Sequence, residues 1–339
     1  MWNPDEFRDM DFGLAEDETF EPEDDLEEDF VPGENEPFIM TILGPIRLDE
    51  AGVTLIHEHL QWAPPGGSDD PDQKLDDPMA ALNDLGAFAT VSGRTVVSAT
   101  PPGAGRDARG LVWMAQRAPV HVIGATGAVS GDAAGVRDRI AEDLEQGMDG
   151  TGARPGVFVV GGEEASEAEK AAIEEFAARR KAHDLPVISL APATRQREVI
   201  ERLGRAGVPA GKVIVSRAGE LAPGDIGPLL NEGAWLLFDG IGVSGEADQE
   251  TARRIVQGAS DGSIDRMLLS HGYRRRSSLT GYQGRPGFPY VIEQFAVMLL
   301  EEGMEAHDVR KMLVDNAAAA LAIVAAASGS TQLHREGRR

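Results

Sequence analysis

The chain has no cysteine among its 339 residues, which excludes disulfides and thiolate metal sites. It also lacks any apolar run of about 18 residues, so we expect no membrane span. A secretory signal has a basic stretch followed by an apolar one, and the N-terminus of this chain does not show that pattern. These absences are compatible with a soluble protein of the reducing cytoplasm. The hydrophobic fraction of 42% is enough for a substantial folded core.

Positive charge is nearly absent from residues 1–37. This segment holds 16 Asp or Glu and one Arg, a balance of −15 within a net charge of −25. It has neither helical nor strand periodicity, so we predict a disordered acidic tail. Such a tail disfavours nucleic acid as a partner, because phosphate would be repelled. Aromatic and aliphatic residues recur among the acids, so the tail is either a solubilising segment or a docking segment for a protein partner.

From about residue 38, short apolar runs alternate with amphipathic helices. Eight buried strands with intervening helices over about 290 residues are typical of a single (β/α)8 TIM barrel. A doubly wound open sheet is the alternative, but no GxGxxG motif opens its first strand–helix unit. We predict the barrel over residues 38–327, with a flexible end at 328–339. The predicted strands are 52–56, 94–99, 119–125, 156–160, 186–190, 212–216, 234–239 and 267–270, and the last two predicted helices are 290–302 and 306–327.

The first predicted strand ends in His57-Glu58-His59. Residues two apart on a strand face the same way, so both imidazoles can point into the barrel mouth, where TIM barrels place their active sites. Two histidines there can bind a divalent metal such as zinc through their ring nitrogens.

Several stretches of the chain are similar to one known family. TILGPIRLDEAGVTLIHEHL at 41–60 resembles the opening of the phosphotriesterase family of the amidohydrolase superfamily. The resemblance continues through HVIGATG at 121–127, GAWLLFDGIG at 233–242, and MLLSHG to MLVDNAAAALA in the last third. It covers about residues 38–325 and implies a TIM barrel with a two-metal hydrolase site.

The resemblance implies six ligand positions for two zinc-like ions, which activate a bridging hydroxide. His57 and His59 match the first pair. The positions of a carboxylated lysine, two further histidines and an aspartate fall on Val159, Leu190, Arg217 and Gly272. We therefore expect no bound metal, or at most one weakly held zinc or other divalent ion. His271, Asp239, Glu163 and Glu164 are the residues that could replace a lost ligand.

Arginines gather where the ligands are missing. Arg195, Arg217, Arg274 and Arg275 follow predicted strand ends, and guanidinium groups suit carboxylate or phosphate. The alternative is that they are ordinary surface arginines. One hypothesis is an anionic small molecule or protein segment held in a former active site. A second is that the acidic tail covers the mouth, so that deleting residues 1–37 would expose a tighter anion site.

These features predict a phosphotriesterase-like pseudoenzyme that binds an anion at the barrel mouth. The rival prediction is a metal-dependent hydrolase of esters, lactones or phosphotriesters with a reduced metal site. Metal-free catalysis with Arg217 as an electrostatic stabiliser ranks last, because the sequence names no nucleophile or base. The sequence is compatible with a homodimer, but no residue pattern identifies an interface.

Overall fold

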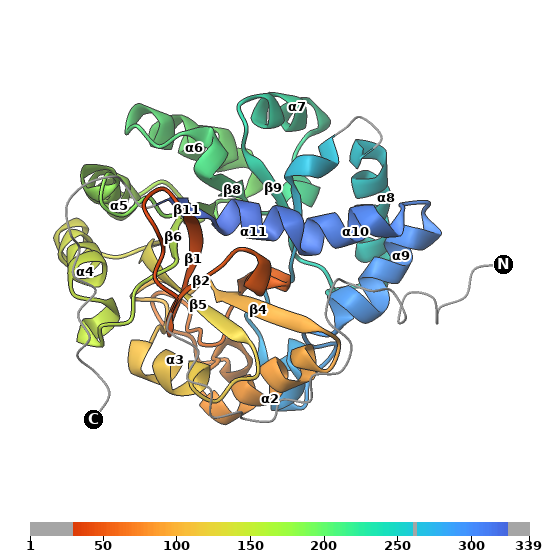
Figure 1. Ribbon diagram of the computed structural model, residues 1–339, viewed down its shortest axis with the longest axis horizontal. Helices are drawn as coiled ribbons and strands as arrows, with labels where there is room; N and C mark the ends of the chain where they lie inside the picture. Colours follow the sequence, from red (N-terminus) through yellow and green to blue (C-terminus); the bar gives the residue numbers. More distant parts are fainter. Residues whose placement is uncertain (1–29, 260–262, 325–339) are drawn as a thin grey trace.

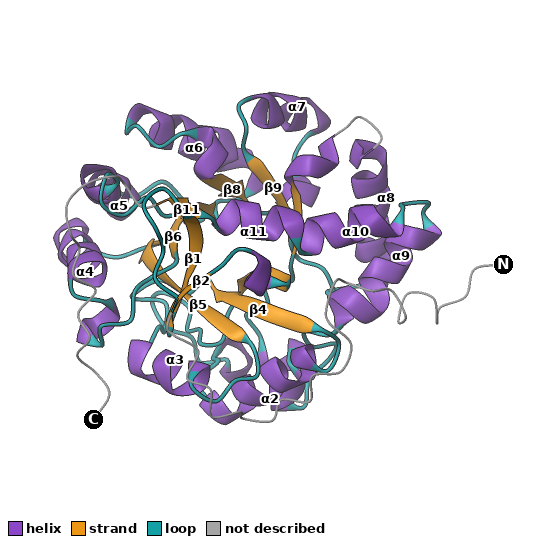
Figure 2. Ribbon diagram, in the orientation of Figure 1, coloured by secondary structure: helices purple, strands orange, loops and turns teal. Residues whose placement is uncertain are grey.

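The computed structural model describes residues 30–259 and 263–324. Eight parallel strands form a nearly closed barrel in chain order, and helices surround it (Figures 1 and 2), so the TIM-barrel prediction is confirmed. Each predicted strand overlaps one barrel strand. The barrel strands are β3 (Val53–Glu58), β4 (Gly93–Ser98), β5 (His121–Ala128), β6 (Val157–Val160), β7 (Val187–Ser189), β8 (Val213–Val215), β9 (Trp235–Phe238) and β10 (Met267–Leu269).

The helices lie between successive strands and after the last. Within the described residues, the α-helices are α2 (Pro78–Ala89), α3 (Ala108–Ala115), α4 (Ala133–Glu145), α5 (Glu167–Arg179), α6 (Gln196–Arg205), α7 (Pro223–Asn231), α8 (Gly245–Ala259), α9 (Ala296–Glu301), α10 (Ala306–Leu313) and α11 (Asp315–Leu321).

Alternate side chains of each strand fill the barrel interior. The inner cluster is built mainly from Val, Ile and Leu, which pack in layers in TIM barrels, and includes Ile56, Val97 and Val159, all 0% exposed. The intervening residues face the helices and form a second, larger cluster. The barrel closes where the Gly272 N–H donates to the carbonyl of His57 at 2.8 Å.

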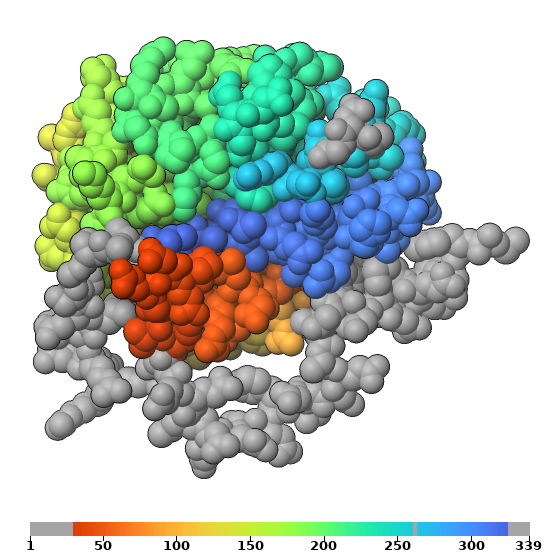
Figure 3. Space-filling view, turned by 45° about the horizontal axis from the view of Figure 1, so that its top comes forward, coloured from red at the N-terminus to blue at the C-terminus, as the bar shows by residue number. Residues whose placement is uncertain are grey.

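A small antiparallel sheet covers the N-terminal end of the barrel. It consists of β1 (Pro37–Thr41), β2 (Gly44–Ile46) and β11 (Ile323–Val324), and the Ile42 N–H donates to Val122 on β5. Figure 1 shows β1, β2 and α11 together across this end, and Figure 3 shows the first strands (red) beside the C-terminal helices (blue).

The predicted helix 306–327 is wrong at Val314 and at 322–324, the last of its residues that the structure describes. It is interrupted between α10 and α11 at Val314, whose backbone leaves helical geometry at φ −119° and ψ −71°, and α11 ends at Leu321. Ile323 then pairs with Phe38, so tertiary pairing overrides an alanine-rich helical pattern. The predicted helix 290–302 also differs, since it starts with a π-helical turn at Val291–Phe295.

Both predicted end segments fall largely outside the described residues, which begin at Phe30 and stop at Val324. Phe30 lies against the guanidinium of Arg47, 4.8 Å from its ring centroid, near the end of the barrel that β2 covers. None of the helices within the described ranges combines the length and apolarity needed to cross a membrane.

We expect the stability of the fold to fall with acid because of His121, which begins β5. Burial lowers the pKa of His121, with Glu50 opposing this shift and Arg94 adding to it. The unfolded chain therefore binds a proton near pH 6.5 while the folded chain resists it, and stability is lost as pH falls below about 6.5. His121→Gln should flatten the decline of the melting temperature between pH 7 and 5. A decline parallel to that of the unsubstituted protein would contradict this role.

Candidate functional site

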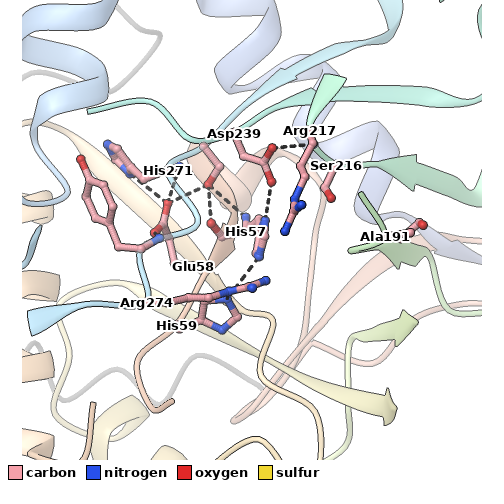
Figure 4. Close-up of polar contacts among 12 residues, drawn as sticks. His57, Glu58, His59, Ala191, Ser216, Arg217, Asp239, His271 and Arg274 are labelled. Atoms are coloured by element: carbon pink, nitrogen blue, oxygen red, sulfur yellow. Dashed lines mark hydrogen bonds and ion pairs between the residues drawn. The ribbon is translucent and has the colours of Figure 1, made fainter. Parts of the chain in front are cut away.

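The C-terminal ends of the strands place the predicted histidine pair at the barrel mouth. His57 lies on β3 and His59 directly follows it, and both are buried, with exposed fractions of 4% and 0%. Their Nε2 atoms approach each other to 3.2 Å, so strand alternation has brought both imidazoles to one point, as predicted (Figure 4).

Asp239, which follows β9, holds His57 in place. Its Oδ2 accepts from the Nδ1 of His57 at 2.6 Å, and its Oδ1 accepts from the backbone N–H of Arg217 at 2.6 Å. Arg217 has a left-handed backbone with φ 56°. Such a conformation costs a residue with a side chain on the order of 1 kcal/mol.

His59 is enclosed by Thr100, Trp62 and Arg274. Its Nδ1 lies 2.8 Å from the hydroxyl of Thr100, and its Nε2 accepts from the Nε of Arg274 at 3.1 Å. The guanidinium of Arg274 also stacks on Trp62, 4.6 Å from the ring centroid. Burial, with the charges of Arg274 and then His57 adding to it, holds the pKa of His59 well below its usual value, so this imidazole is neutral at pH 7. Thr100 and Trp62 were not singled out from the sequence, although Thr100 follows a predicted strand end.

The other four ligand positions implied by the family hold no metal donor. Val159 and Leu190 belong to the apolar cluster inside the barrel. Arg217 presents a cation that pairs with Glu163 through Nη2 at 2.8 Å. Gly272 has no side chain, and a Cβ there would lie 3.2 Å from Cε1 of His57, so this position does adjoin the histidine pair.

The residues considered as replacements do not complete a metal site. His271, which follows β10, contacts the buried carboxylate of Glu58 through its Nδ1 at 2.9 Å, and its Nε2 is buried without a hydrogen-bond partner among the described residues. Asp239 contacts the Nδ1 of His57 and not the Nε2, which is the nitrogen that faces His59. Glu163 pairs with Arg217. Over the described residues, no three His, Asp or Glu side chains are placed to hold a metal ion together.

The four arginines of the predicted anion site have different surroundings. Arg195 is bound to the buried carboxylate of Glu169 and to the carbonyl of Gly162. Arg275 is exposed and lies between Asp70 and Asp72. Arg217 has the single pair with Glu163. Arg274 forms no ion pair with any residue that the structure describes.

A two-metal centre does not fit this donor set. It would have to use two imidazoles beside two guanidinium groups, and the metal-facing Nε2 of His59 is already bonded to a cation. A divalent ion would be repelled by both arginines unless they moved away. The guanidinium side chains of Arg217 and Arg274 extend toward each other at the mouth (Figure 4).

Comparison with known proteins supports the family that the sequence motifs and the barrel indicate. The model of the phosphotriesterase family matches residues 37–321, so the chain belongs to the phosphotriesterase family. It is 26% identical to the phosphotriesterase homology protein of Escherichia coli, over 80% of this chain and 98% of that protein. It is 24% identical to the N-acetyltaurine hydrolase of Salmo salar, over 82% and 96%. A solved structure of a resiniferatoxin-binding protein from Rhodobacter sphaeroides superimposes with a TM-score of 0.73 at 26% identity, covering 84% of this chain and 94% of that one.

Proposed function

We propose that this barrel binds a small anion at its mouth through Arg274 and Arg217, in place of two-metal hydrolysis. The observation that carries the proposal is Arg274, a partly buried guanidinium without a carboxylate partner among the described residues. Removing a cation from water costs free energy unless an opposite charge is nearby. A bound anion would supply the negative charge that no described carboxylate provides to Arg274.

The electrostatics of the mouth support an anion. Burial lowers the pKa of Arg274, and the neighbouring charge of Arg217 lowers it further, while Asp239 and Glu163 act in the opposite direction. Arg274 is bonded to His59 through its Nε, and its two terminal nitrogens form no hydrogen bond with the residues that the structure describes, so they could make a bidentate contact with carboxylate, phosphate or sulfonate. The relatives are consistent with a mouth that accepts small molecules, since two are named for hydrolysing or binding one.

Binding of simple anions tests the proposal. Inorganic phosphate, succinate and N-acetyltaurine are titrated calorimetrically at low and high salt. We expect at least one probe to bind, more weakly as salt rises, and Arg274→Met to weaken it by about tenfold or more, since a charge-assisted hydrogen bond contributes roughly 1.5–3 kcal/mol. Arg217→Asn should also weaken binding while tolerating the left-handed backbone.

The matched control is Arg275→Ala, which removes an adjacent exposed arginine that lies between Asp70 and Asp72. It should leave binding within about twofold of the unsubstituted protein, because those carboxylates already screen this charge. Absence of binding by all three probes, or full binding by Arg274→Met, would overturn the proposal.

The rival function is a hydrolase that uses a reduced metal site. Metal analysis of the purified, untagged protein decides between the two, and we expect well below one equivalent of zinc. One or two tightly held equivalents, with an esterase or lactonase activity that disappears in His57→Ala, would establish the hydrolase instead.

A further inference from the structure

The hydrogen bonds of Thr100 determine which nitrogen of His59 carries the proton. The Thr100 hydroxyl lies 2.6 Å from the carbonyl of Gln61, which can only accept, so the single hydroxyl hydrogen is donated there. The hydroxyl oxygen must then accept from Nδ1 of His59 at 2.8 Å. In the neutral ring, Nε2 therefore carries a lone pair that faces the mouth.

His57 is arranged in the same way. Its Nδ1 faces the carboxylate of Asp239, which can only accept, so Nδ1 holds the proton and the Nε2 of the neutral ring carries a lone pair. The two Nε2 atoms lie 3.2 Å apart. Two zinc–nitrogen bonds of about 2.0–2.1 Å can span that separation, and Nδ1–H bonds to oxygen are the usual support of metal-binding histidines. The pair is thus oriented to bind a cation.

A cation of the chain itself is bonded to one member of this pair. The Nε–H of Arg274 donates to the Nε2 lone pair of His59 at 3.1 Å, and the face of Trp62 lies against the same guanidinium. Figure 4 shows this side chain reaching the two imidazoles from the loop after β10. Gly272, where the family pattern has an aspartate, offers Arg274 no carboxylate that would draw it elsewhere.

We infer that Arg274 is a built-in cation that takes the place of a metal ion at His57 and His59 and keeps divalent metals out. The histidine pair is then a closed metal site rather than a degraded one. This property concerns metal exclusion and does not depend on whether an anion binds.

Removing the guanidinium tests the inference. Full-length, metal-stripped protein is titrated with Co²⁺, followed by its visible absorption, and with Zn²⁺ by equilibrium dialysis, in buffer without phosphate. We expect Arg274→Ala to bind both ions at least about tenfold more tightly than the unsubstituted protein, because a fixed positive charge at hydrogen-bond distance from a ligand nitrogen repels a divalent ion. Arg274→Met, which keeps the bulk and loses the charge, should show a gain of the same sign.

Two controls test whether the gain in metal affinity arises at His57 and His59. Arg275→Ala should bind metal no better than the unsubstituted protein, and Arg274→Ala combined with His59→Ala should lose the gain. The inference is overturned if neither Arg274 variant binds metal more tightly, or if the combined variant keeps the gain.

A measurement on the unsubstituted protein does not depend on how the variants fold. Long-range ¹H–¹⁵N spectra distinguish the two tautomers of a neutral histidine. We expect Nδ1–H for His59, as acceptance from Arg274 requires, and an Nε2–H tautomer would overturn the inference. Because none of the three probe anions is present in either experiment, failure here and failure of the anion titrations are separate results.

Discussion

Glu58→Ala should lower the free energy of unfolding by about 3–5 kcal/mol, because several buried hydrogen-bond donors would lose their acceptor at roughly 1–3 kcal/mol each. The Glu58 side chain is 0% exposed, and its Oε1 accepts from the hydroxyl of Ser270 at 2.8 Å. It also accepts from the backbone N–H of His271 at 2.8 Å and lies 2.9 Å from Nδ1 of His271. The substitution would leave the backbone N–H and the Nδ1 of His271 without this acceptor, whereas the Ser270 hydroxyl could still donate to the carbonyl of His57 at 3.0 Å.

Urea unfolding measures this effect, and two further variants calibrate it. Glu58→Gln keeps an acceptor oxygen and should cost less than Glu58→Ala. Glu201→Ala removes an exposed carboxylate that pairs with Arg205, and should change stability by less than about 0.5 kcal/mol. If Glu58→Ala were no more destabilising than Glu201→Ala, the carboxylate would not be joining the first and last barrel strands.

Gly127→Ala should destabilise the barrel by about 3 kcal/mol or more, because two separate constraints meet at this position. Gly127 has φ +124°, which L side chains rarely adopt, and its Cβ would lie 1.9 Å from the carbonyl oxygen of Val159 on the neighbouring strand. A backbone oxygen in a paired strand cannot move aside without breaking the β5–β6 register.

The matched control is Gly86→Ala within α2. Gly86 has ordinary helical geometry, and its Cβ would meet nothing within 4 Å, so the substitution should stabilise the protein by about 0.5–1 kcal/mol. Thermal melting followed by circular dichroism compares the two variants. Equal melting temperatures would show that Gly127 is not required by the backbone.

The barrel was predictable because its signal is local. Each buried strand is an apolar run bounded by turns, and most of the helices show their own periodicity, so the eight strands could be counted without knowing their contacts. The short strands β1, β2 and β11 were missed, since two to five residues carry too little pattern and pair only through tertiary contacts. Helix α7 was missed as well, because Pro223, Pro228 and two glycines obscure its pattern.

For the candidate site, the sequence placed His57 and His59 together, since residues two apart on one strand must share a face. It also identified the four positions without a metal donor. The sequence could not show which of the arginines lacks a carboxylate partner. Arg195 and Arg274 are chemically identical, and both follow barrel strands.

Only the tertiary structure separates them, because an arginine's role depends on which carboxylates lie within reach. Helix α5 brings Glu169 against Arg195, whereas the loop after β10 carries Arg274 to His59 and Trp62. The sequence by itself thus determined a phosphotriesterase-family barrel with two of six ligand positions kept. Only the folded structure shows that a guanidinium is bonded to one member of this pair, because Arg274 and His59 are 215 positions apart in the sequence.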